Sequence, residues 1–200
     1  MILKNKVQAV LKIYRKLETD TALFQSASGL SCKPGCGACC TYPEIYAAPL
    51  EFLPYAFHQY HAGMAEDKLE QLKTEFAELK TCCLYSHSQL ALGPGGCLEY
   101  EFRGLVCRIF GFGTMTMKDG RHSLIACKIL KEKHPAIFDQ SESSREKLRI
   151  APIAANYYLP LASIDYELSE KQLPVNSAII KALEYVVAYY SYRKKKQAID

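Results

Sequence analysis

Apolar side chains recur every three or four positions in the first 25 residues, with lysines and arginines between them. The apolar series runs from Ile2 through Tyr14 to Leu17. Because an α-helix turns once in about 3.6 residues, this spacing places the apolar side chains on one face. Segment 1–25 is therefore predicted to be an amphipathic helix, and apolar periodicity of this kind favours packing on a core over lying on a membrane.

Helical spacing returns in later segments. A helix is expected to start between Pro49 and Phe57, a second spans residues 65–80, and the last begins near residues 175–177. Helical spacing also resumes after Leu130, and proline interrupts a helix because it lacks the backbone N–H. Breaks are expected at Pro135, Pro152, Pro160 and Pro174.

Two other segments have non-helical patterns. Residues 26–40 are rich in serine, glycine and proline, which predicts a loop. Residues 113–126 form two short alternating runs on either side of Asp119-Gly120, which is a strong hairpin signal. The predicted fold class is mainly α with a small β-hairpin (α+β), in one domain over residues 1–200. Cysteine-rich loops over about 30–130 would surround a site, with helical flanks at 1–25 and 140–200.

The composition is that of an ordinary globular protein. The chain has 200 residues, of which 49% are hydrophobic and 23% charged, so it can bury a core without needing a metal to fold. The net charge of +4 is modest, and much of it lies in the tail from Tyr192 to Lys196. A solvated tail is expected there, and no nucleic-acid partner, because no basic face surrounds it.

The nine cysteines change the functional picture. Basic residues interrupt the N-terminal apolar segment, so it does not read as a secretory signal, and no stretch reaches the about 18 apolar residues of a membrane span. A cytoplasmic protein with no membrane span is therefore expected. In that reducing compartment an odd number of thiols indicates metal ligands or redox groups rather than a disulfide framework.

Four cysteines lie within CKPGCGACC, and two of them are adjacent. Neighbouring side chains point apart, so Cys39 and Cys40 do not easily share one ion, whereas they can serve two metal atoms or two corners of a cluster. The thiol count allows two mononuclear sites, a thiolate-bridged pair of ions, or an iron–sulfur cluster with reserve thiols. The candidate metal ligands are Cys32, Cys36, Cys39, Cys40, Cys82, Cys83, Cys97, Cys107 and Cys127.

Some neighbouring residues suit a thiolate-rich site. Gly35 and Gly37 allow backbone N–H groups to point at sulfur. Arg103 and Arg108 flank Cys107 and are candidates for offsetting the negative charge of bound thiolates; plain surface arginines are the alternative. His87 is the best non-cysteine ligand candidate because it follows the second cysteine pair; the weaker candidates are His58, His61, His122 and His134.

The order of these motifs resembles the YkgJ-like cysteine-cluster family, also called CxxCxxCC and described as a zinc- or iron-chelating domain, whose members are mostly bacterial or archaeal. The opening Cys-x3-Cys-Gly-x-Cys-Cys is followed by the Cys82-Cys83 pair and then by the segment 97–112. The positions that match the second half of the family pattern are Cys97, Tyr100, Arg103, Cys107 and Arg108, with Cys127 as the later cysteine.

The match covers roughly residues 30–130 and has three departures. The first gap of the opening motif has three residues rather than two, Gly104 replaces the usual proline, and either Cys82 or Cys83 suits the middle ligand, with Cys82 slightly preferred.

The resemblance implies a metal-binding protein that chelates iron, including an iron–sulfur cluster, or alternatively zinc. A redox or electron-transfer role is one expectation. A metal-dependent enzyme, either an oxidoreductase or a methylase-like enzyme acting on protein, is a second. A zinc-stabilised module that binds a protein partner through the C-terminal helix or tail is a third.

Overall fold

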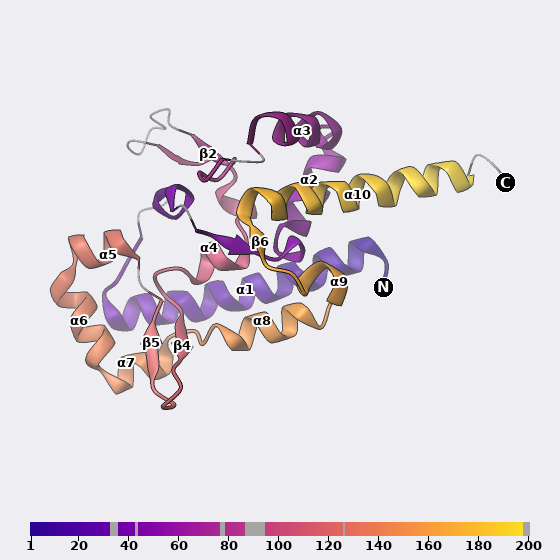
Figure 1. Ribbon diagram of the computed structural model, residues 1–200. Coiled ribbons are helices and arrows are strands. Elements are labelled where there is room, and N and C mark those ends of the chain that lie inside the picture. The colour runs from indigo at the N-terminus through magenta and orange to yellow at the C-terminus, as the bar shows by residue number, and fades with distance from the viewer. Residues whose placement is uncertain (33–35, 43, 77–78, 87–94, 126, 198–200) are drawn as a thin grey trace.

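The computed structural model describes residues 1–32, 36–42, 44–76, 79–86, 95–125 and 127–197. Most of this chain is helical (Figure 1). The α-helices are α1 (Leu3–Ser28), α2 (Leu53–His61), α3 (Ala65–Gln71), α4 (Leu105–Ile109), α5 (Lys128–Lys133), α6 (Pro135–Ser143), α7 (Arg145–Ile150), α8 (Ala155–Ala162), α9 (Tyr166–Ser169) and α10 (Val175–Gln197). Shorter helical turns are η1 (Ala38–Thr41), η2 (Pro49–Phe52), η3 (Leu72–Phe76) and η4 (Tyr100–Phe102).

The strands in the described ranges form three antiparallel pairs. These are β1 (Tyr46–Ala47) with β6 (Leu173–Pro174), β2 (Tyr85–Ser86) with β3 (Gly96–Cys97), and β4 (Thr114–Thr116) with β5 (His122–Leu124). Helices with small two-stranded pairs confirm the predicted fold class. No helix in these ranges is both long and apolar enough to cross a bilayer.

Helix α1 follows from its apolar spacing. Its buried positions recur every three or four residues over four turns, as an amphipathic helix requires. They are Leu3, Val7, Val10, Tyr14 and Leu17. The helix ends where Gly29 takes a φ of +77°, and the Gly29 N–H donates to the carbonyl of Gln25.

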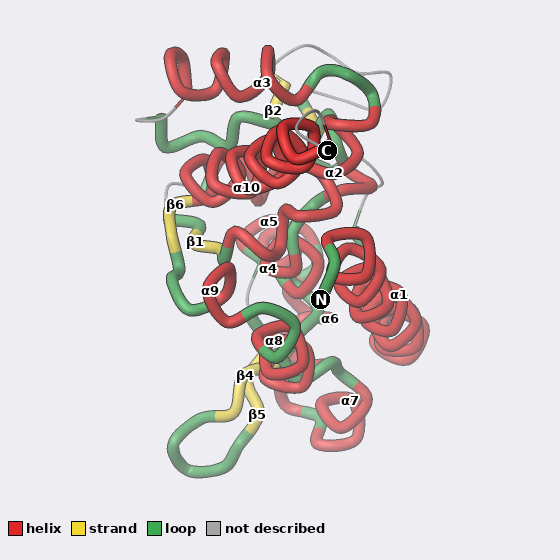
Figure 2. Tube along the Cα trace, turned by 90° about the vertical axis from the view of Figure 1, so that its right-hand side faces the viewer, coloured by secondary structure: helices red, strands yellow, loops and turns green. Residues whose placement is uncertain are grey.

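Helix α10 forms much of the rest of the core. It packs on α2 and η2, and Figures 1 and 2 show it above α1, with α8 below α1. Ala178 and Ala182 are fully buried on its inner face beside Ile179 and Leu183. Each buried aliphatic side chain of the leucine size stabilises the fold by roughly 1.5–3 kcal/mol. Helix α10 is therefore held in place by a well-packed core.

The predicted hairpin is present. Strands β4 and β5 pair with Met115 opposite Ser123, and the turn uses Gly120 at a φ of +78°. The hairpin projects from the helical body (Figure 2). The pairs β1–β6 and β2–β3 were not predicted, because each strand has two residues, too few to show an alternating pattern.

Three boundary predictions need correction. Helix α1 continues to Ser28, so the loop starts later than residue 26. The helix predicted over 65–80 is α-helical to Gln71 and then widens into the π turn η3. Pro160 lies inside α8 rather than breaking it. Proline has no N–H to donate to the carbonyl of Asn156, but Asn156 is exposed, so water can replace that hydrogen bond. The helix then ends soon after, at Ala162.

Candidate metal centre

Turn η1 carries the adjacent cysteines Cys39 and Cys40. Gly37 precedes this turn, and a Cβ atom on Gly37 would lie 2.7 Å from the ring of Tyr85 and 2.9 Å from the Cα of Gly96. Only glycine leaves room for so close an approach. The opening cysteine loop can therefore lie directly against the β2–β3 pair.

Backbone hydrogen bonds bring the second and third cysteine segments to the first. The Cys82 N–H donates to the carbonyl of Cys40 over 2.9 Å. Strand pairing sets Tyr85 opposite Cys97, and the Leu98 N–H donates to the carbonyl of Leu84 over 2.8 Å. These hydrogen bonds hold Cys40, Cys82 and Cys97 close together, although the three cysteines are far apart in the sequence.

The thiols at this point contact one another. The Cys40 thiol has hydrogen-bond contacts with Cys39, Cys82 and Cys97. Cys39 also contacts Cys107 of α4, and Cys82 also contacts Cys83. We call the connected set the six-thiol cluster; it consists of Cys39, Cys40, Cys82, Cys83, Cys97 and Cys107. All of them are reduced.

Hydrogen bonding divides these thiols into two kinds. Thiol donors at Cys107 and Cys40 lower the pKa of Cys39, and the nearby charge of Arg103 lowers it further. Contacts with Cys40 and Cys83 lower the pKa of Cys82 in the same way. The pKa of Cys40 is raised, because its contacts with these neighbours favour its protonated form. The contact with Cys40 lowers the pKa of Cys97 as well. The cluster therefore favours thiolates at Cys39, Cys82 and Cys97, the form in which cysteine binds metal.

Arg103 and Arg108 have different surroundings. The Arg103 guanidinium lies 4.0 Å from the centre of the Tyr100 ring, and its charge acts on Cys39. Its Nε is buried and has no hydrogen-bond partner among the described residues. Such a buried donor is costly unless something negative lies nearby. Arg103 is therefore the arginine suited to offset thiolate charge.

Arg108 joins α4 to α1. Its buried guanidinium forms an ion pair with Glu18, donates from Nε to the carbonyl of Arg103 over 3.0 Å, and lies 4.5 Å from the centre of the Tyr14 ring. These contacts give Arg108 a role in fixing the segment that carries Cys107.

The remaining three cysteines form a smaller group. The Cys32 and Cys36 thiols are hydrogen-bonded to each other, and this contact lowers the pKa of Cys36. Cys127 is the N-cap of α5 and is close enough to act electrostatically on Cys32. Gly111, at a φ of +90°, makes room for it, since a Cβ there would lie 3.1 Å from the Cβ of Cys127.

Asn176 is a positioning residue that the sequence did not reveal. It is buried at the start of α10, and its Oδ1 accepts the Cys83 N–H over 2.8 Å. Its Nδ2 donates to three carbonyls at 3.0 Å, those of Phe76, Leu79 and Thr81. One side chain thus orients the segment that carries Cys82 and Cys83. The sequence indicated only that a helix begins there.

The histidines lie elsewhere or outside the described residues. His58 stacks on Phe102 at 4.4 Å between ring centres, and the His61 ring packs edge-on against Tyr190. His122 lies in β5 and His134 between α5 and α6. His87 falls outside the described residues.

Among the described residues, no group of three or more His, Cys, Asp or Glu side chains is placed so that it could hold a metal ion as it stands. The cluster consists of thiols in pairwise contact, and a cysteine sulfur moves by rotation about a single bond. Neighbouring sulfurs on a tetrahedral zinc ion are roughly 3.8 Å apart, given a Zn–S bond of about 2.3 Å. Thiols that already contact one another are therefore within reach of a shared metal, and the donor set fits zinc or iron.

The sequence matches no protein-family model, and no curated protein and no solved structure matches it. Membership of the YkgJ-like family therefore stays a prediction.

Proposed function

We propose that the six-thiol cluster binds a metal centre, either iron as an iron–sulfur cluster or zinc. The observation that carries the proposal is that four chain segments bring six free thiols into one connected series of pairwise contacts. A metal explains the concentration of thiols better than packing does, because an aliphatic side chain would fill the same space without polar atoms to satisfy.

The adjacent pair has a role in this proposal. The expectation that their side chains point apart is not met, because the Cys39 and Cys40 thiols contact each other; in addition, Cys39 contacts Cys107, whereas Cys40 contacts Cys82 and Cys97. Two neighbouring sulfurs that contact each other and also have different further partners suit two adjacent metal atoms, or two corners of one cluster. The greater number of contacts made by Cys82 favours it over Cys83 as the main ligand of that pair.

Residues of the chain would support the bound centre in two ways. The positive charge of Arg103 would offset part of the negative charge of the thiolates. Asn176 would fix the backbone of Cys83. An iron–sulfur cluster would supply electron transfer, whereas zinc would supply structural stability. Thiols that bind metal must stay out of disulfides, which a reducing compartment favours, so a cytoplasmic location is part of this proposal.

The resemblance to the YkgJ-like cysteine-cluster family agrees with this function. The family is described as chelating zinc or iron, and the residues of this chain that match its pattern include Cys97 and Cys107 of the six-thiol cluster. The match also includes Arg103, which acts on Cys39. We propose the family on these residues.

The test is anaerobic purification followed by measurement of iron, zinc, acid-labile sulfide and the visible spectrum. A brown protein with sulfide identifies the iron–sulfur cluster, and a colourless protein with stoichiometric zinc identifies the zinc centre. A folded protein that takes up neither metal, even after reconstitution, refutes the proposal.

Two matched variants test which thiols bind. Cys40→Ser removes the thiol with the most contacts and is expected to abolish most metal binding. Cys127→Ser removes a thiol outside the six-thiol cluster and is expected to keep the centre. Equal metal loss in the two variants would show that the smaller group belongs to the same centre, and equal retention would exclude Cys40 as a ligand.

A further inference from the structure

Cys32 and Cys36 form a pair of thiols outside the six-thiol cluster. Their side chains are hydrogen-bonded to each other. Cys32 packs on a second group of buried apolar side chains, whereas Cys40 and Cys82 lie in the main core. The second group includes Phe112, Leu130 and Phe138. The pair is therefore anchored in a different part of the fold from the centre of the six-thiol cluster.

The contact within this pair suits a disulfide better than a metal. A zinc ion or an iron–sulfur cluster is usually held by about four donors. Cys40 contacts three further thiols, whereas the thiol in contact with Cys36 is that of Cys32. A disulfide needs only two thiols, and rotation about single bonds can bring sulfurs in contact to the S–S bond length of about 2.05 Å.

The surroundings of the pair favour reaction with a small molecule. Both thiols are half-buried, so a small reagent can reach them. The charge of Lys133 in α5 acts on Cys36, and the charge of Arg103 acts on Cys32. A nearby cation favours the thiolate, which is the form of cysteine that attacks a disulfide. Cys36, beside Lys133, is therefore suited to attack first, with Cys32 in contact to complete the exchange.

We propose that Cys32 and Cys36 are a redox-active dithiol that exchanges with low-molecular-weight disulfides and is converted reversibly into an intrachain disulfide. The Cys36 thiolate attacks one sulfur of the small disulfide, whose S–S bond breaks, and the departing thiolate takes a proton from solvent. The Cys32 thiol then loses its proton to solvent and attacks the Cys36 sulfur. The Cys32–Cys36 bond forms and the second small thiol is released.

This exchange transfers two electrons from the pair to the small disulfide, so no further oxidant is needed. Disulfides that form in a reducing compartment are usually transient and act in catalysis or redox sensing. The pair would therefore respond to the ratio of small disulfides to small thiols around the protein. The inference does not rest on the metal centre, because neither cysteine belongs to the six-thiol cluster.

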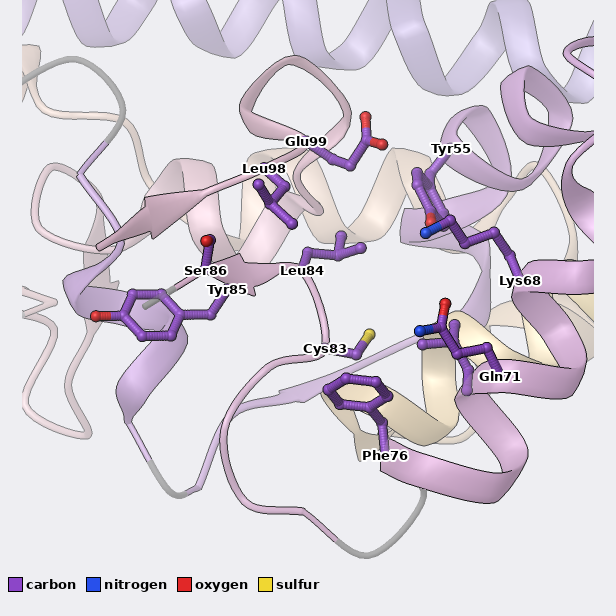
Figure 3. A pocket seen from close by; sticks show the side chains of 11 residues that line it. Tyr55, Lys68, Gln71, Phe76, Cys83, Leu84, Tyr85, Ser86, Leu98 and Glu99 are labelled. Carbon is purple, nitrogen blue, oxygen red and sulfur yellow. The ribbon is translucent and has the colours of Figure 1, made fainter. Parts of the chain in front are cut away.

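A thiol of the six-thiol cluster is the main competitor for the same reagent. Cys83 lines a cavity of about 290 Å³ between α2, α3, η3 and the β2–β3 pair, and Figure 3 shows its sulfur close to the Phe76 ring. The described residues that line this cavity do not include Cys32 or Cys36. Because Cys83 also contacts Cys82, the position of the disulfide distinguishes the two pairs.

The experiment treats the anaerobically purified full chain, with any metal that it holds, with oxidised glutathione. The remaining thiols are alkylated, and peptide mass mapping locates the disulfide. We expect the loss of both the Cys32 and the Cys36 thiol, a disulfide between them, and an unchanged metal content. Excess reduced glutathione is expected to restore both thiols.

Two variants test the order of the steps. Cys32→Ser removes the thiol that completes the exchange, so the reaction is expected to stop at a mixed disulfide between Cys36 and glutathione. Cys127→Ser is the matched control, because it removes the neighbouring thiol that acts electrostatically on Cys32, and it is expected to form the Cys32–Cys36 disulfide. Circular dichroism confirms folding, and mapping of the natural chain tests the proposal even if a variant does not fold.

The proposal is overturned if oxidised glutathione leaves both thiols free, if the disulfide joins other cysteines, or if Cys127→Ser prevents it. The absence of a mixed disulfide at Cys36 in Cys32→Ser also overturns it. Oxidation of the pair only after metal has been removed would place the pair in the metal centre and overturn the proposal as well. A chain that binds no metal yet forms the Cys32–Cys36 disulfide refutes the proposed function and supports this inference.

Discussion

Replacing Asn176 by alanine is expected to destabilise the fold by roughly 3 kcal/mol. The side chain is 2% exposed, accepts the Cys83 N–H, and donates through Nδ2 to three carbonyls. Nδ2 carries two hydrogens, so the substitution removes about three hydrogen bonds, each contributing roughly 1 kcal/mol net.

The share of this free-energy loss that falls on each lost hydrogen bond depends on how exposed the partner of Asn176 is. The Cys83 N–H lies in a buried residue, so it loses its partner without gaining water. Leu79 is 53% exposed, so its carbonyl can be hydrated instead. Most of the loss therefore comes from the cysteine segment itself, and metal affinity is expected to fall together with stability.

The assay is urea unfolding followed by circular dichroism, with a thermal melt as a second measurement. For a chain of 200 residues, 3 kcal/mol corresponds to a fall of about 6–12 °C in Tm. Asn156→Ala, an exposed asparagine in α8, is the matched control and should change stability by about 0.5 kcal/mol or less. Asn176→Asp keeps the acceptor but removes both N–H donors, so it should also destabilise. If Asn176→Ala unfolds within about 1 kcal/mol of the natural chain, the reasoning is wrong.

Three further predictions concern buried residues around the site. Burial raises the pKa of Glu51 to about 7 despite hydrogen bonds from backbone N–H groups. The folded chain therefore holds a proton that the unfolded chain releases near pH 4.5, and the free energy of unfolding falls by up to roughly 3 kcal/mol between about pH 4.5 and 7. Glu51→Gln should remove this component, measured as the difference between two urea-unfolding series across that pH range; parallel series would contradict the assignment. Gly104→Ala should cost about 1–3 kcal/mol, because its Cβ would lie 2.9 Å from the Phe52 ring, and an unchanged urea midpoint would show that the ring moves freely. Arg108→Lys should cost about 2–4 kcal/mol in the same assay, because a lysine cannot keep the ion pair, the Nε bond and the ring contact together; a loss below about 0.5 kcal/mol would count against a buried role.

Local signals in the sequence predicted the local structure well. Helix α1 has an uninterrupted apolar face, and Asp119-Gly120 supplies the turn of the β4–β5 hairpin. Pro160 misled the prediction, because a proline near a helix end can be tolerated when the freed carbonyl is exposed. Each of these outcomes depends on a few neighbouring residues.

The contacts between cysteines of distant segments could not be predicted from the sequence. The spacing of CKPGCGACC identified the thiols, but contact between Cys40 and Cys97 depends on the β2–β3 pair and the Cys82–Cys40 backbone bond. Nothing near Asn176 in the sequence pointed to the loop that it holds. The family pattern has proline where this chain has Gly104, whose φ of −64° would suit proline. Glycine is needed there because Phe52 occupies the space a side chain would use.

The wide separation of the thiols along the chain has a kinetic consequence. Cys40 meets Cys82 and Cys97 only after loops of about 40 and 60 residues have closed, and closure of long loops slows folding. Cys32 to Cys40, by contrast, are close together as soon as that segment is synthesised. A metal ion that meets the nascent chain would therefore find the opening motif first and the remaining ligands last. The metal would then be bound first by the thiols of the opening motif. It would gain Cys82 and Cys97 as ligands later, at a rate set by the folding of the helical body.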